Sequence, residues 1–126
     1  MVALDIPEIV DLGFRIGPVA AEAPCVFFSG TGDAAAVAAL QQFTQALHEE
    51  LVFKQARSID VELKDLYFMN SSCLKAFVSW IHKVETEGRP YAIRFLMNPR
   101  QQWQMRSLAT LQRLAPMVVS VVDIDS

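Results

Sequence analysis

Asp65-Leu66-Tyr67-Phe68-Met69-Asn70-Ser71-Ser72-Cys73-Leu74-Lys75-Ala76-Phe77 is the stretch in which a predicted strand ends and, after two hydroxyl side chains, a helix begins. The first N–H groups of a helix have no partner within the helix, and Asn and Ser are residue types that cap them. The same unpaired N–H groups suit an anion such as phosphate. The stretch therefore predicts a strand-to-helix junction that is either a plain helix cap or an anion site.

The size and charge of the chain restrict it to a few classes of protein. The chain has 126 residues, of which 52% are hydrophobic, and we expect one domain that spans residues 1–126. The net charge is −3 and the eleven Lys and Arg residues are scattered, which argues against a nucleic-acid-binding surface. No apolar run approaches the roughly 20 residues that cross a bilayer, so no membrane insertion is expected.

The N-terminal residues and the cysteines indicate a compartment. Residues 1–10 contain Asp5 and Glu8 and lack a basic start followed by a long apolar run, so they do not resemble a secretory signal. Two cysteines, Cys25 and Cys73, do not make a disulfide framework. We expect a cytoplasmic protein with both thiols reduced.

The hydrophobic pattern predicts an α/β fold. Beyond an N-terminal arm or edge strand in residues 1–13, the chain alternates strands with three amphipathic helices, an order typical of parallel strands joined by crossover helices. We expect a mixed sheet of about four to six strands with about three helices packed on it. Strands are predicted at 14–19, 23–29, 58–63, 91–97 and 117–124, beside the strand of the junction, and helices at 34–52, from the junction to Gly88, and at 102–115.

Two local details accompany this prediction. Gly17-Pro18 is predicted to lie at the bend of a hairpin, and residues 29–33 are predicted to form a turn in which Asp33 caps the first helix. The third helix is predicted from four apolar residues that recur at spacing three. These residues are Met105, Leu108, Leu111 and Leu114.

Other candidate sites receive less support from the residues. Gly30 to Ala35 fits the outline G-x-G-x-x-A of a dinucleotide loop, but Asp33 places a carboxylate where a pyrophosphate would lie. His48 begins a zinc-like pattern in which Val52 replaces the second histidine, so no metal site is expected. His48 and His82 are interpreted as residues at a helix surface or boundary. Asp123 and Asp125 are interpreted as solvated acids, although they could meet a cation.

Cys73 admits two interpretations. A thiol at a helix N-terminus can be activated as a nucleophile, because the helix dipole lowers its pKa. Such a nucleophile still needs a base, and no histidine is near it in the sequence. The alternative, which we favour, is a small buried residue where the helix meets the sheet.

The residues from Ile59 to Lys75 resemble the signature of the STAS family, the domain shared by sulfate transporters and anti-sigma-factor antagonists. In that family a strand leads through an apolar residue, Asp or Asn, Ser or Thr, and Ser into a helix, as Met69-Asn70-Ser71-Ser72 does here. The segment 66–76 is more similar still to the SiaC-like bacterial regulatory phosphoproteins, whose corresponding stretch also has an asparagine, a phosphorylated hydroxyl, a second serine and a lysine, here Asn70, Ser71, Ser72 and Lys75. The order of the predicted elements agrees with the family from residue 14 to residue 124.

The resemblance implies a role for each residue of the motif. Ser71 is the implied phosphoacceptor, and Asn70, Ser72, Cys73 and Lys75 are the implied residues of the switch and of partner binding. The resemblance therefore implies a non-enzymatic bacterial signalling protein that uses no cofactor. Its implied partners are an anti-sigma-factor-like serine protein kinase, a PP2C-type phosphatase and a downstream signalling enzyme. Two alternatives stay open: a small-molecule or nucleotide-sensing STAS module without phosphorylation, and an enzyme that depends on Cys73.

Overall fold

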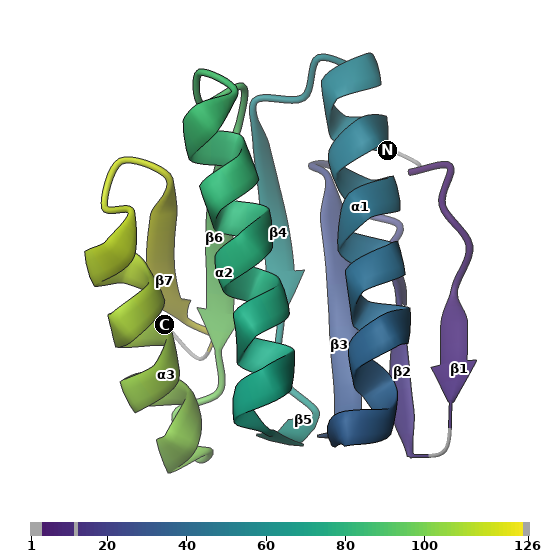
Figure 1. The fold of residues 1–126 in the computed structure, drawn as a ribbon, viewed down its shortest axis with the longest axis vertical. Coiled ribbons are helices and arrows are strands. Elements are labelled where there is room, and N and C mark those ends of the chain that lie inside the picture. Colours follow the sequence, from purple (N-terminus) through teal and green to yellow (C-terminus); the bar gives the residue numbers. More distant parts are fainter. Residues whose placement is uncertain (1–3, 12, 125–126) are drawn as a thin grey trace.

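The computed structural model describes residues 4–11 and 13–124, and in them a mixed sheet carries three α-helices (Figure 1). Residues 1–3 and 12 of the predicted N-terminal arm, and Asp125 of the acid pair, lie outside the described residues. The strands are β1 (Ile9–Asp11), β2 (Phe14–Pro18), β3 (Cys25–Gly32), β4 (Ser58–Glu62), β5 (Leu66–Met69), β6 (Ala92–Met97) and β7 (Val119–Asp123). The helices are the 3₁₀ turn η1 (Ala34–Ala36), α1 (Val37–Phe53), α2 (Ser71–Thr86) and α3 (Gln102–Leu114).

The sheet confirms the predicted α/β class. Its strand order is β1-β2-β3-β4-β6-β7, and β5 pairs with β3 beyond the end of β4. The pairs β1–β2 and β2–β3 are antiparallel, whereas β3–β4, β3–β5, β4–β6 and β6–β7 are parallel. The sheet has seven strands, one more than the upper end of the expected range of about four to six, because the N-terminal arm also contributes the three-residue strand β1.

The helices all cover one face of this sheet (Figure 1). In β4 the buried residues Ile59 and Val61 alternate with Asp60, and in β6 Ile93 and Phe95 alternate with Arg94. Because neighbouring side chains of a strand point to opposite faces, the apolar residues meet the helices and the polar residues lie on the other face. There the Arg94 guanidinium donates two hydrogen bonds, of 2.9 and 2.8 Å, to the Asp60 carboxylate.

The region before α1 differs from the prediction. Residues 29–32 belong to β3 and are not a turn, although Asp33 caps as predicted: its carboxylate accepts the N–H of Ala35 at 3.0 Å. β2 runs through Gly17 and Pro18, so the hairpin bend lies after them. Glycine and hydroxyl residues in a short run are typical of a turn, but residues 29–32 are held as a strand because β2 and β5 both pair with them.

The second and third helices position the junction and its surroundings. α2 follows β5 after a single residue, Asn70, and lies beside α1 (Figure 1). α3 forms where the spacing predicts a helix, but only two of the four spaced residues face the core: Met105 and Leu114 are exposed, and Gln104 is buried beside Leu108 and Leu111. Among the described residues, none of the helices is long and apolar enough to cross a membrane.

Candidate functional site at the start of helix α2

Asn70 is the cap of helix α2. Its backbone is extended, and its side-chain oxygen accepts the N–H of Cys73 at 2.9 Å. Within residues 4–11 and 13–124, no hydrogen bond reaches the N–H groups of Ser71 or Ser72. The junction is therefore a capped helix start that still presents two free backbone donors, which is the combination that binds anions.

Two contacts tie this helix start to the carboxyl end of β3. The N–H of Asn70 donates to the carbonyl of Gly32 at 2.8 Å. The Cys73 thiol donates to the carbonyl of Asp33 at 3.2 Å. The starts of η1 and α2 are thus joined, because they follow the neighbouring parallel strands β3 and β5.

The five residues of the motif differ in exposure. Ser71, Ser72 and Lys75 are exposed, Asn70 is half-buried and Cys73 is fully buried. A partner or a kinase can therefore reach Ser71 directly. Cys73 can affect such a partner only through the position of the backbone that it fixes.

The environment of Cys73 does not activate a nucleophile. Burial raises the pKa of its thiol, and the negative charge of Asp33 raises it further. Its hydrogen bond goes to a backbone carbonyl, not to a base. Cys25 is also free and buried, and burial, with the charges of Glu62 and Asp60, raises its pKa to about 11. Both thiols are built into the core.

Two exposed aromatic residues lie directly before Met69 and Asn70, and neither is among the predicted site residues. Tyr67 is 56% exposed and Phe68 is 49% exposed, although both belong to β5. Alternation in a half-buried strand predicts that only one of two neighbours is exposed. The burial order along Leu66, Tyr67, Phe68 and Met69 does not alternate, so this signal appears only in the structure.

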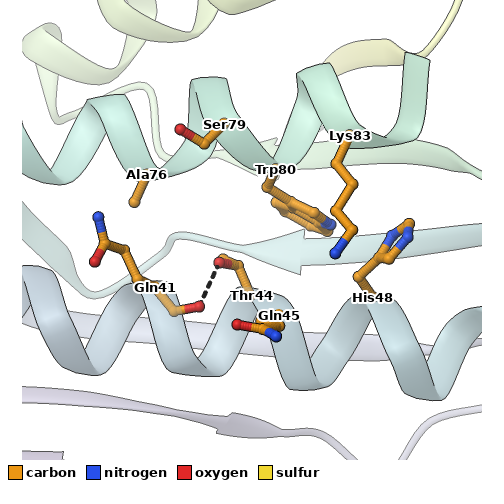
Figure 2. A pocket seen from close by; sticks show the side chains of 8 residues that line it. All are labelled: Gln41, Thr44, Gln45, His48, Ala76, Ser79, Trp80 and Lys83. Atoms are coloured by element: carbon orange, nitrogen blue, oxygen red, sulfur yellow. Dashed lines mark hydrogen bonds between the residues drawn. The ribbon is translucent and has the colours of Figure 1, made fainter. Parts of the chain in front are cut away.

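A groove between α1 and α2 is a second candidate site (Figure 2). His48 is at its floor and is only 3% exposed, so the expectation of a surface or boundary residue is wrong for it, whereas His82 is exposed. The two ring nitrogens of His48 contact the Tyr91 hydroxyl at 2.6 Å and the Glu87 carboxylate at 2.9 Å. The indole N–H of Trp80 donates to the same hydroxyl at 2.8 Å. Sequence reasoning misses this cluster because residues 48, 80 and 91 share no local pattern.

The structure places the other sequence candidates in strands. Gly30 and Gly32 belong to β3, where Gly30 has a φ of +90° and closely approaches Gly13. No three His, Cys, Asp or Glu side chains gather into a possible metal site in the part of the chain that the structure describes. Asp123 ends β7, away from the junction in the strand order.

Comparison with solved structures finds this fold in a signalling complex. A chain in the crystal structure of the diguanylate cyclase SiaD with its activator SiaC, from Pseudomonas aeruginosa, matches with a TM-score of 0.68 and 14% sequence identity. The match covers 94% of this chain and 99% of that chain. At 14% sequence identity, this similarity establishes that the two chains share a fold. Neither a protein-family model nor a curated protein matches the sequence.

Proposed function

We propose that this protein is a non-enzymatic, SiaC-like signalling regulator whose binding to a partner is switched by phosphorylation of Ser71. The unmodified form binds the partner, a serine kinase of the anti-sigma-factor type adds the phosphate, and a PP2C-type phosphatase removes it. The observation that carries this proposal is an exposed Ser71 at the first position of α2, within a fold shared with the SiaD–SiaC complex.

The helix start favours a phosphate without a change of fold. The phosphoryl group adds about −1.5 to −2 charges, and the positive end of the helix dipole stabilises negative charge there. The free N–H groups of Ser71 and Ser72 are donors for its oxygens, and exposed Lys75 lies one turn further on. Asp33, joined to this turn through Cys73, opposes the added charge. Because the helix dipole and the free N–H groups stabilise the phosphate where it is attached, the modified protein is expected to stay folded.

The exposed aromatic pair next to Ser71 provides the surface on which the charge acts. Tyr67 and Phe68 are each about half exposed, and large aromatic side chains are typical anchors of protein interfaces. A partner that docks on both the end of β5 and the start of α2 would cover Ser71, so a phosphate there would lose water on docking. A loss of about 3 kcal/mol would weaken binding by roughly two orders of magnitude.

The comparison suggests a class of downstream partner. SiaC is the activator of the diguanylate cyclase SiaD. By analogy we propose a diguanylate cyclase encoded in the same genome as the signalling enzyme that this protein contacts. The analogy rests on the fold, and the Ser71 surface supplies the residues with which to test it.

The test compares phosphorylation with binding. After incubation with serine kinases from the same genome, mass spectrometry is expected to locate phosphate on Ser71 and none on Ser71→Ala. In calorimetry against the cyclase, Ser71→Ala should bind like the wild type. Ser71→Glu should bind at least about tenfold more weakly, because a charge enters the interface.

Ser120→Glu is the matched control, since Ser120 is exposed on β7 at the far edge of the sheet. It adds the same charge away from the site and should bind like the wild type. Equal affinities of Ser71→Ala and Ser71→Glu for a partner that binds the wild type would rule out the switch.

A further inference from the structure

The groove between α1 and α2 has a volume of about 370 Å³, within the usual range of small-molecule sites. It stays open because small side chains, Ala76 and Ser79, face it from α2, opposite Thr44 of α1 (Figure 2). The remaining lining residues are Gln41, Gln45, His48, Trp80 and Lys83.

The polar atoms at the floor of the groove are already engaged. Trp80 and His48 are each 3% exposed, and their ring nitrogens bond to Tyr91 and Glu87. The Thr44 hydroxyl donates to the carbonyl of Gln41 at 3.1 Å. The floor is therefore a fixed surface that a ligand could contact closely but to which it could form few hydrogen bonds.

The side chains that form the walls of the groove, in contrast, have free polar atoms. Within residues 4–11 and 13–124, no protein hydrogen bond engages the side chains of Gln41, Gln45, Ser79 or Lys83, and the charge of Lys83 acts on Glu87 without forming a close ion pair. Figure 2 shows the Lys83 ammonium directed toward the space between Trp80 and His48. One cation, two amides and one hydroxyl thus line one hollow without a hydrogen-bond partner among the described residues.

We propose that this groove binds a small polar carboxylic acid, such as a hydroxy acid, keto acid or amino acid. One ammonium group balances one carboxylate, while amide groups both donate and accept and so suit a ligand with further hydroxyl, carbonyl or amino groups. The methyl group of Ala76 and the Trp80 ring would contact its short carbon chain. This site is separate from the Ser71 switch and does not rest on it.

The surroundings select against a phosphate or a multiply charged ligand. Phosphate sites typically use arginine forks or a helix N-terminus, and the groove lies along the middle of α1 and α2 with no arginine in its lining. Glu49 and Glu87 line the adjoining hollow, which shares His48 and Lys83 with the groove. Their negative charge makes a second anionic group unfavourable there.

Titration followed by ¹H–¹⁵N NMR tests the proposal, with the indole N–H of Trp80 as the reporter and Trp103→Phe to assign it. The probes are sodium lactate, pyruvate and glutamate, with sodium phosphate and sodium chloride at the same ionic strength. At least one carboxylate is expected to give a saturable shift of the Trp80 signal. Lys83→Gln should weaken this binding about tenfold or more.

Lys64→Gln is the control, because Lys64 is exposed on the loop before β5 and outside the groove. It should bind the carboxylates like the wild type, and unfolding of both lysine variants should match the wild type. No saturable shift with any carboxylate, tighter binding of phosphate, or unchanged binding by Lys83→Gln would overturn the proposal. Phosphorylation of Ser71 and binding to the cyclase should be unaffected by Lys83→Gln, so the two proposals can fail separately.

Discussion

At the scale of single residues, Gly30 fits a nucleotide-loop motif, but the backbone conformation explains why a glycine stands there. Its φ of +90° is a region that side chains disfavour, and a Cβ built there would lie 1.8 Å from the Gly13 carbonyl oxygen. That carbonyl accepts the N–H of Thr31 at 2.8 Å, at the register shift where β3 turns from β4 toward β5. The glycine that fits a nucleotide-loop outline is required by the backbone.

Replacing Gly30 should therefore be more damaging than replacing another glycine of positive φ. Gly88→Ala is the matched control, because Gly88 has a φ of +82° but nothing lies within 4 Å of a Cβ built there. Urea unfolding should show a loss of about 1–2 kcal/mol for Gly88→Ala, from backbone strain alone. Gly30→Ala adds the clash, so it should lose about 3 kcal/mol or more. Equal losses would contradict this account.

At the scale of elements, α3 holds the junction in place through an amide that the apolar pattern does not reveal. The Gln104 amide nitrogen donates to the carbonyls of Leu63 and Leu66, each at 2.9 Å, and its oxygen accepts the N–H of Asn98 at 2.8 Å. These bonds fix the start of β5, which leads into Ser71. Positions at spacing three drift by about 60° per step around a helix, so Met105 and Leu114 lie about half a turn apart and both leave the core.

The exchange Gln104→Leu should destabilise the protein although it makes the core more apolar. It removes all three hydrogen bonds of the amide, and although the Leu63 carbonyl keeps the N–H of Leu66 at 3.2 Å, the loss should cost about 2–4 kcal/mol in urea unfolding. Hydrogen exchange of the Asn98 amide should accelerate in the same variant. Met105→Ala, at the neighbouring residue that is 55% exposed, should change stability by no more than about 0.5 kcal/mol. If Gln104→Leu were as stable as this control, the amide would have no structural role.

At the scale of the whole molecule, a polar cluster joins elements that are distant in the sequence. His48 of α1 meets Glu87, which follows α2, and Tyr91, which precedes β6. The hydrogen bond from His48, with smaller contributions from the charges of His48 and Lys83, lowers the pKa of Glu87 against the effect of its burial. Burial raises the pKa of Tyr91, so its hydroxyl stays neutral and available to both Trp80 and His48.

The lowered pKa of Glu87 predicts how stability depends on pH. A carboxyl group with a depressed pKa in the folded state stabilises the fold above its unfolded pKa, near 4.3, and this contribution disappears as the pH falls through the folded value. The difference in unfolding free energy between wild type and Glu87→Gln should therefore be constant above about pH 5 and shrink below about pH 4.3. Urea unfolding from pH 3 to 7 measures it, and Glu49→Gln controls for the loss of one exposed charge. A difference that did not shrink in acid would exclude the pairing with His48.

The sequence by itself determined the α/β class, the three crossover helices, the Asp33 cap and the junction at Asn70, because helix periodicity and caps depend on residues near one another in the chain. Only the tertiary structure decided that β5 pairs with β3, that Gln104 is buried, and that His48, Trp80 and Tyr91 form the floor of a groove. Those features arise from contacts across about 40 residues, as the separation of His48 from Tyr91 shows. A local pattern cannot specify which distant polar atoms will satisfy one another.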